Sequence, residues 1–229
     1  MNIGVFMMKR MTVFAALLLF VCAAASYAAG FEGKVVYQVN TGGRTTDVTV
    51  YAKDQKTRTE LVGPQGQDIK MVTDLEARTA YMLLDDQKMA MKMPLELPAR
   101  VAETIERAKP ERTGKTKTIL GRECEQIIVK NQENMIEIWS AKGLGSFNGI
   151  LGRSPGGTNS GLPDMSAFTG LEEFFPMAVT VRDKTGRQTF SMEAKSVEPQ
   201  QLADNMVSVP SDYQMVTSPP GYRLQSKSR

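Results

Sequence analysis

The sequence predicts a mainly β (α+β) protein: a strongly curved antiparallel half-barrel of roughly eleven strands, with two or three helices over its concave face. Short segments with apolar residues at every second position recur along the chain between turn residues, which is typical of antiparallel strands. A helical period occurs in only two places. A meander of this length must bend or pack against something, and so few helices would cover only one of its sides.

Six consecutive strands are predicted in the first half of the chain. Their ranges are 33–40, 47–52, 57–62, 68–74, 78–85 and 88–94. The first of them alternates around Val35, Tyr37 and Val39. Turn sequences such as TGGR and GPQGQ separate the strands. Because such short connections join antiparallel neighbours, we expect these strands to form a meander.

The period changes after the sixth strand. Leu97, Val101, Ile105 and Ala108 recur at the spacing of an amphipathic helix, and Pro110 lies beyond its expected end. Strands then resume at 115–120, 124–130 and 134–141. One helix is therefore expected between two groups of strands.

The last third of the chain begins with a loop rich in Gly, Ser and Pro, residues 143–163, which is long for a compact domain. Asp164 can cap a short helix that carries Phe168, Leu171 and Phe175. A hairpin of segments 177–183 and 187–197 follows, and 206–210 is expected as the last strand. We expect the loop and helix to form a lid over the concave face.

The first 28 residues have the features of a cleaved secretory signal. Lys9 and Arg10 precede an apolar run from Met11 to Ala25, and small residues stand at 26 and 28. The expected domains are therefore a signal peptide (1–28), a single domain (29–224) and a disordered tail (225–229). We expect a periplasmic or secreted, soluble protein, monomeric and without a transmembrane segment in the mature chain. The small net charge of +3 gives no reason to expect a nucleic-acid partner.

Composition excludes several kinds of enzyme. The chain has no histidine, which excludes Ser-His-Asp and Cys-His nucleophiles and imidazole-based zinc sites. TGKT at 113–116 lacks the upstream glycine of a phosphate-binding loop. Cys124 is the only cysteine after the signal peptide, so no internal disulfide is possible, and we expect its thiol to be buried. No catalytic residue, cofactor or metal is predicted, and the protein is not expected to be an enzyme.

The order of the elements resembles that of a known group of proteins. It is carried by FEGKVVY after the signal, KTRTEL, TGKTKTILGRECEQIIV, IEIWSAKGLG and VPSDYQMV. This order resembles a bacterial family of exported proteins with an uncharacterised domain, similar in fold to the periplasmic LolA-like lipoprotein carriers. Those carriers are half-closed antiparallel barrels whose helices cover an apolar cavity for acyl chains. The resemblance implies a LolA-like half-barrel with an apolar pocket, and no carrier residue can be placed in this chain.

The segment KMAMKMP, residues 88–94, puts three methionines at every second position. On a strand they point to one side, and Lys88 and Lys92 point to the other, which we expect to face water. Three interpretations remain open: ordinary core, the wall of an apolar pocket, or a thioether site for Cu(I). Sulfurs two residues apart on one strand are about 7 Å apart, which disfavours copper.

The function predicted from these features is binding of an apolar ligand such as an acyl chain, lipid or lipidated peptide. The expected ligand-binding residues are Met71, Met82, Met89, Met91, Met93, Ile136, Ile138, Phe168 and Leu171. The alternative is a protein-interaction or envelope-structural module with a filled core and an envelope protein as its partner. Methionine-based Cu(I) binding is the more remote alternative.

Overall fold

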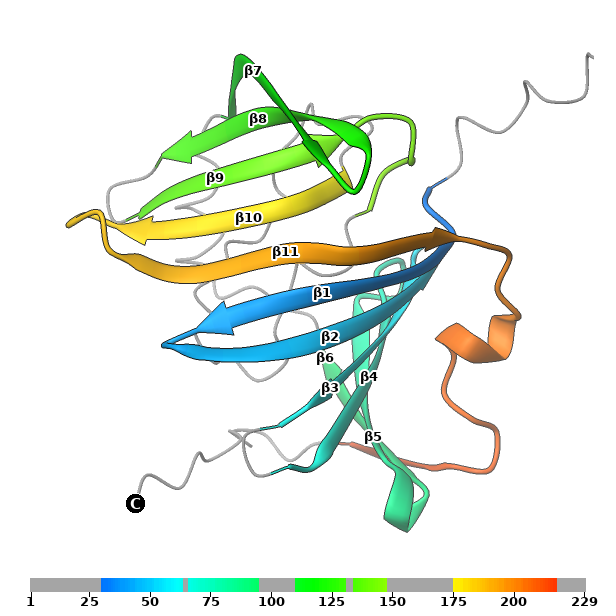
Figure 1. Ribbon diagram of the computed structural model, residues 1–229. Helices are drawn as coiled ribbons and strands as arrows, with labels where there is room; N and C mark the ends of the chain where they lie inside the picture. The colour runs from blue at the N-terminus through cyan, green and yellow to red at the C-terminus, as the bar shows by residue number, and fades with distance from the viewer. Residues whose placement is uncertain (1–29, 64–65, 95–109, 131–133, 148–174, 218–229) are drawn as a thin grey trace, which may run out of the picture.

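Twelve strands form one sheet in the computed structural model, which describes residues 30–63, 66–94, 110–130, 134–147 and 175–217 (Figure 1). The strands are β1 (Gly33–Thr41), β2 (Arg44–Lys53), β3 (Lys56–Val62), β4 (Asp68–Asp74), β5 (Thr79–Leu84), β6 (Met89–Pro94), β7 (Pro110–Ile119), β8 (Arg122–Lys130), β9 (Asn134–Ala141), β10 (Phe175–Asp183), β11 (Gln188–Pro199) and β12 (Gln214–Thr217). Their order in the sheet is β12-β6-β5-β4-β3-β2-β1-β11-β10-β9-β8-β7. The predicted mainly β class and the six-stranded meander are confirmed.

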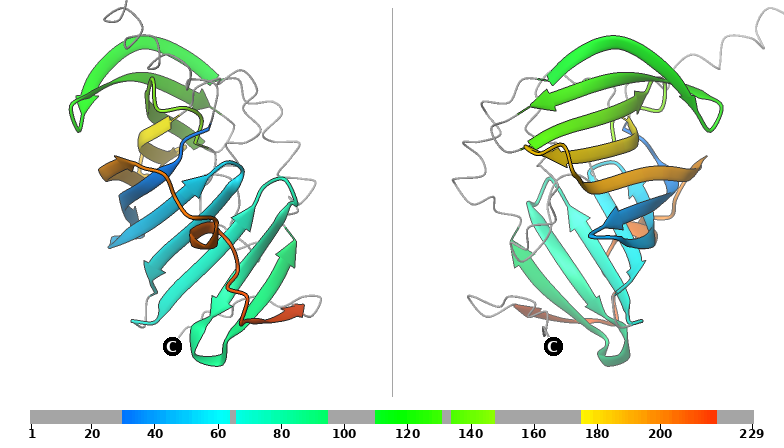
Figure 2. Two further views of the ribbon diagram at one scale, coloured as in Figure 1. Left: turned by 90° about the vertical axis from the view of Figure 1, so that its right-hand side faces the viewer. Right: turned by 60° about the vertical axis from the view of Figure 1, so that its left-hand side comes forward.

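The sheet consists of two meanders joined at one pair of strands. β1 to β6 are neighbours in chain order, as are β7 to β11, and β1 pairs with β11 between the two groups. The sheet twists along its length, so that β4 to β6 run at a steep angle to β9 to β11 (Figures 1 and 2). The ordinary right-handed twist of strands accounts for this change of direction. The sheet is not strongly curled, so the predicted strong curvature is not observed.

Four predictions about individual elements are wrong. Residues 206–210 are not a strand: the 3-10 helix η3 (Asp204–Val207) occupies this part, and the last strand is β12. β12 pairs with β6 in parallel, so the sheet is not wholly antiparallel. β7 begins at Pro110 and continues through a bulge between Arg112 and Thr116, and Phe175 opens β10 rather than ending a helix.

The helices predicted from Leu97 to Ala108 and after Asp164 lie outside the described residues, as does most of the expected lid. Within the described ranges the only helical elements are two 3-10 helices, η3 and η1 (Asp85–Gln87). The predicted helical cover of the sheet therefore stays a prediction.

The main core lies on one face of the sheet, which we call the inner face and which carries Val35, Tyr37 and Ile138. Phe31, Phe147 and Phe175 meet there, with ring centroids 4.8 to 5.6 Å apart. Tyr37 stacks on Phe147, and its hydroxyl donates a hydrogen bond to the carbonyl of Pro176 at 2.9 Å. Burying each such ring stabilises the fold by about 1.5–3 kcal/mol, so this cluster of four rings contributes substantially to the core.

A second, smaller core lies on the opposite, outer face of β4 to β6. Val72, Leu83 and Ala90 are buried there against Val209 and Tyr213 of the C-terminal segment. This segment, residues 200–217, crosses the outer face from the end of β11 to the edge of β6 (Figure 2). The alternation of MVSVP suggested a strand, but these residues cross the strands instead of extending the sheet.

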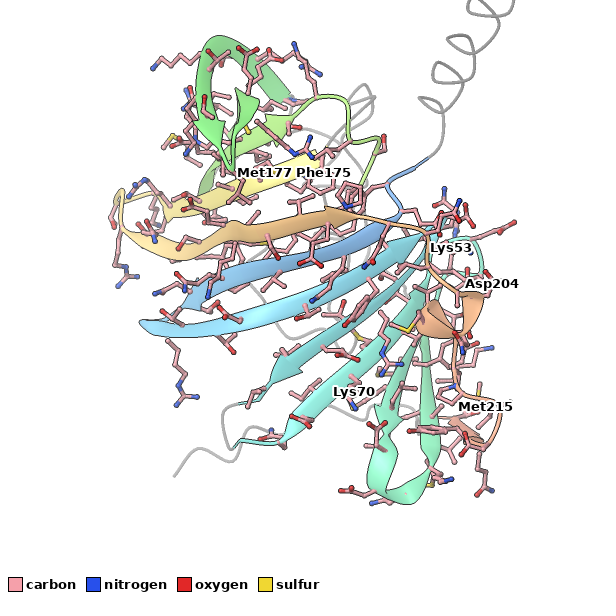
Figure 3. The ribbon with its side chains drawn as sticks, turned by 45° about the vertical axis from the view of Figure 1, so that its right-hand side comes forward. Lys53, Lys70, Phe175, Met177, Asp204 and Met215 are labelled. Carbon is pink, nitrogen blue, oxygen red and sulfur yellow. The ribbon has the colours of Figure 1, made fainter. Side chains whose placement is uncertain are left out.

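Ion pairs hold the C-terminal segment in place. Lys53 of β2 pairs with Asp204 of η3 at 2.7 Å, where the two labelled side chains meet in Figure 3. Lys88 pairs with Asp212 at 2.7 Å. The hydroxyl of Tyr213 donates to Asp85 at 2.7 Å. The segment is thus attached at both ends, so the outer-face core is covered by residues far away in the sequence.

Candidate functional site

Three methionines form a line across three neighbouring strands. Met71 of β4 lies directly opposite Met82 of β5, and Met82 lies directly opposite Met91 of β6. Residues opposite one another in antiparallel strands have Cβ atoms about 4.5–5.5 Å apart. Val216 of β12 extends the line beyond Met91. We call Met71, Met82 and Met91 the methionine row.

The methionine row lies on the inner face of the sheet. Met71 is opposite Thr59, Thr59 is opposite Val50, and Val50 is opposite Val35 of the main core. Directly opposite residues point to the same face, so the row and the core share one face. The predicted orientation of the methionines toward the interior side is therefore confirmed.

The methionine row is part of a larger apolar surface that is only half-buried. Its further members are Leu61, Ile69, Leu84 and Met89, each partly exposed. Leu84 lies directly opposite Met89, so the surface continues beside the row across β5 and β6. We call these seven residues the methionine surface. Leu61, Ile69 and Leu84 were missed as site residues, although the period-two pattern of their strands could have placed them on this face.

Three details of segment 88–94 differ from the prediction. Met93 lies opposite Ala80 on the inner face, and both residues are buried, so Met93 is not part of the half-buried methionine surface. Ala90 points to the same side as Lys92, yet it is fully buried because the C-terminal segment covers it. The lysine side is therefore not simply a water-facing side. Lys88 precedes the strand and adopts a left-handed backbone, with φ 48°, at the end of η1.

The other predicted site residues are not next to the methionine row. Ile136 and Ile138 of β9 lie on the inner face but are fully buried in the main core, several strands away in the sheet order. Phe168 and Leu171 lie outside the described residues. The structure thus brings together the five predicted methionines of β4 to β6, with Met93 at the buried end, and leaves the isoleucines in the packed interior.

A buried polar atom lies beside the methionine surface. Thr57 of β3 is 4% exposed, and its hydroxyl oxygen has no hydrogen-bond partner in the part of the chain that the structure describes. Thr57 is opposite Thr73 and two residues from Thr59, the neighbour of Met71. A buried hydroxyl without a partner is costly, so this position favours a polar group beside the apolar surface.

The described residues give no other indication of metal or membrane chemistry. They contain no group of three or more His, Cys, Asp or Glu side chains that could hold a metal ion. Among them, no helix is long and apolar enough to cross a membrane. Methionine thioethers are not among these four residue types, so the methionine surface stands apart from this result. It is the apolar candidate site.

The fold and site define a mainly β protein with a half-buried, methionine-rich apolar surface on its sheet. The chain belongs to the family described as "Domain of unknown function (DUF4412)", whose model matches residues 31–213. This match confirms the resemblance to a family with an uncharacterised domain. A search of the curated proteins found no match.

Several solved structures are similar to the chain. They include MucB in "Crystal structure of MucB in complex with MucA(peri)", with 12% identity and TM-score 0.45 over 82% of this chain and 57% of that one. PNGF-II in space group P21 matches with 13% identity and TM-score 0.48 over 82% and 32% of the two chains. A putative outer membrane lipoprotein-sorting protein domain from Vibrio parahaemolyticus matches with 6% identity and TM-score 0.33 over 78% and 90%. The chain spans less than two thirds of the first two proteins.

Proposed function

We propose that this protein is an exported binding protein for an apolar ligand, an acyl chain, lipid or lipidated peptide, and not an enzyme. The observation that supports this proposal is the half-buried methionine surface on the inner face of β3 to β6. Methionine side chains are flexible and polarizable, so a surface rich in them adapts to apolar partners of variable shape. Each CH₂ group of an acyl chain that leaves water would contribute about 0.8 kcal/mol to binding.

The proposed compartment rests on the sequence. Residues 1–28 have the charge and apolar pattern of a secretory signal, and the proposed mature domain spans residues 29–224. In an aqueous compartment, an acyl chain needs a carrier that shields it from water. Thr57, whose hydroxyl has no hydrogen-bond partner among the described residues, would donate to the polar end of such a ligand.

The test is binding of a fluorescent fatty-acid probe to the mature protein. Met91→Glu puts an unpaired carboxylate in the methionine surface, so we expect it to abolish binding of the probe. Met215→Glu is the matched control, because Met215 of the adjacent strand β12 lies opposite Ala90 on the outer face and is 52% exposed. This control should bind like the wild type.

Two outcomes would contradict the proposal. One is a wild-type protein that binds no probe and carries no lipid in native mass spectrometry. The other is equal loss of binding in both glutamate variants. Thermal unfolding of each variant separates a loss of binding from a loss of fold.

Cu(I) binding is the second candidate function, and one observation favours it. The objection that methionines on one strand are too far apart does not apply across strands, because Met82 lies directly between Met71 and Met91, and Cβ atoms of directly opposite residues are about 5 Å apart. Thioethers are soft ligands that select Cu(I). The row thus places three thioethers side by side on three neighbouring strands.

A triple variant separates the two candidates. Replacing Met71, Met82 and Met91 by leucine conserves apolarity and nearly conserves volume, at under about 1.5 kcal/mol for each change. If the ligand is an acyl chain, this variant should bind the probe within a few fold of wild type. If the ligand is Cu(I), wild type should bind it in an anaerobic titration and the variant should not. A filled-core structural module would bind neither ligand.

A further inference from the structure

A hollow lies on the outer face of the sheet, on the opposite side from the methionine surface. It is a cavity of about 320 Å³ over β1, β9, β10 and β11, which are neighbours in the sheet (Figure 1). Lys117 of β7 also lines the cavity, and β7 and β8 bend at this end of the sheet (Figure 2). Its lining is largely polar, in contrast to the methionine surface.

Two rows of directly opposite residues form the floor of the cavity. One row runs from Glu137 through Thr180 and Ser191 to Asn40 and Thr45, all of them polar. The other row runs from Trp139 through Ala178 and Glu193 to Gln38. Ala178 is the smallest side chain in the second row, so it leaves a depression between the indole and the carboxylate of Glu193.

Hydrogen bonds fix the orientation of Trp139. Its Nε1–H donates to Oε1 of Glu137 at 2.7 Å, and Nε2 of Gln126 donates to the same oxygen at 3.1 Å. The hydroxyl of Thr113 donates to Oε1 of Gln126 at 2.8 Å, which holds that amide in place. The indole has thus used its only donor, so it offers the cavity an apolar face. The second carboxylate oxygen of Glu137 has no partner among the described residues.

The charges around the cavity balance. Lys117 and Arg182 are basic, and Glu137 and Glu193 are acidic. In the described part of the chain, none of these four side chains forms an ion pair with another of them. The ammonium of Lys117 lies 4.4 Å from the centre of the indole ring, a weak contact at an exposed lysine. A balanced set of this kind favours a neutral ligand rich in hydrogen-bonding groups over an anion or a cation.

We propose that this cavity binds one sugar ring of a neutral glycan. A sugar ring has an apolar C–H face that packs against an indole, and hydroxyls that both donate and accept hydrogen bonds. Glu137, Glu193, Gln38 and Asn40 supply complementary donors and acceptors from the floor, and Arg182 supplies donors from the rest of the lining. The volume lies at the lower end of the roughly 300–1,000 Å³ typical of small-ligand pockets, which suits a single ring.

The chain contains its own probe for this site, because Trp139 is its single tryptophan. The experiment titrates the mature protein with maltotriose, cellotriose and chitotriose while the tryptophan emission is recorded. We expect a saturable change in emission with at least one of the three sugars. Glu193→Ala should weaken that binding about tenfold or more, because it removes hydrogen bonds to a charged group. Glu76→Ala, at an exposed glutamate between β4 and β5, is the matched control and should bind like wild type.

Three results would overturn the proposal. The first is no saturable change with any of the three sugars at millimolar concentration. The second is equal binding by wild type and the Glu193→Ala variant, with both shown to be folded by circular dichroism. The third is a saturable response to tetramethylammonium that the sugars do not reproduce, which would assign the indole to a cationic ligand. The fatty-acid probe of the inner face is not affected by any of these outcomes.

Discussion

A single buried hydroxyl connects two strands of the main core that are not neighbours in the sheet. Tyr37 is fully buried, and its hydroxyl donates to the carbonyl of Pro176. Burial raises the pKa of Tyr37 well above its ordinary value, so the hydroxyl keeps its proton and remains a donor. β1 and β10 are not adjacent in the sheet, so this bond connects strands on either side of β11.

Tyr37→Phe should therefore destabilise the protein while preserving its fold. The change keeps the ring but leaves a buried carbonyl without its donor, which costs about 1–3 kcal/mol. Urea unfolding of the mature protein measures this loss. The conservative control is Tyr51→Phe on β2, because Tyr51 is only partly buried and its hydroxyl forms no hydrogen bond within the described part of the chain. Equal stability of Tyr37→Phe and wild type would refute the role of the hydroxyl.

Cys124 is a second buried group at this scale. It is 0% exposed, and burial is the main cause of a raised pKa of its thiol. The predicted burial of Cys124 is thus confirmed. Because the thiolate is the reactive form, we expect a maleimide reagent to label the mature protein only after denaturation. Rapid labelling of the folded protein would contradict this expectation.

At the scale of elements, the C-terminal segment depends on a carboxylate with a lowered pKa. Asp85 accepts hydrogen bonds from Lys70, the larger cause, and from Tyr213, and both lower its pKa below the ordinary 3.8. A lowered pKa in the folded state adds stability above the ordinary value, and this contribution is lost as the pH falls through the folded-state pKa. The segment should therefore loosen in acid.

Asp85→Asn measures this contribution. We expect the variant to be less stable than wild type at neutral pH, by under about 1 kcal/mol because the pair is partly exposed. The difference should shrink as the pH falls below 3.8, where wild type also loses the charge. Thermal unfolding over this pH range is the measurement, and the Asp86→Asn variant at a neighbouring exposed residue is the control. A difference that does not change with pH would exclude an electrostatic origin.

The elements differ in how well their sequences predict them. β4 and β9 have the predicted bounds because their apolar alternation begins and ends at clear turn signals. The predicted range of β7, 115–120, is shorter than the observed strand, because the exposed threonines and lysines before Ile119 show no apolar alternation. The alternation of MVSVP predicts a strand where the structure has η3. The buried residue of η3, Val207, is buried because the segment packs across the strands of the first meander and not because it joins the sheet.

At the scale of the whole molecule, the sequence indicates which face a side chain occupies but not which strands become neighbours. Alternation alone placed Met71, Met82 and Met91 on one face. Their direct opposition depends on turn lengths and register, which became visible only in the sheet. Ile136 and Ile138 show the same alternation, yet they lie in the packed core, since burial is decided by distant segments. The rows of the outer cavity come from both meanders, so no local pattern predicted them.

The pairing of β1 with β11 has a consequence for how the chain reaches its native state. β1 is among the first strands to leave the ribosome, whereas β11 follows only after nearly the whole chain. Until then one edge of β1 exposes unpaired N–H and C=O groups beside apolar side chains, a template for aggregation. Contacts so distant in sequence also slow folding, because the intervening chain must close as a loop first. The nascent protein thus has a vulnerable period, which ends when its last long strand arrives.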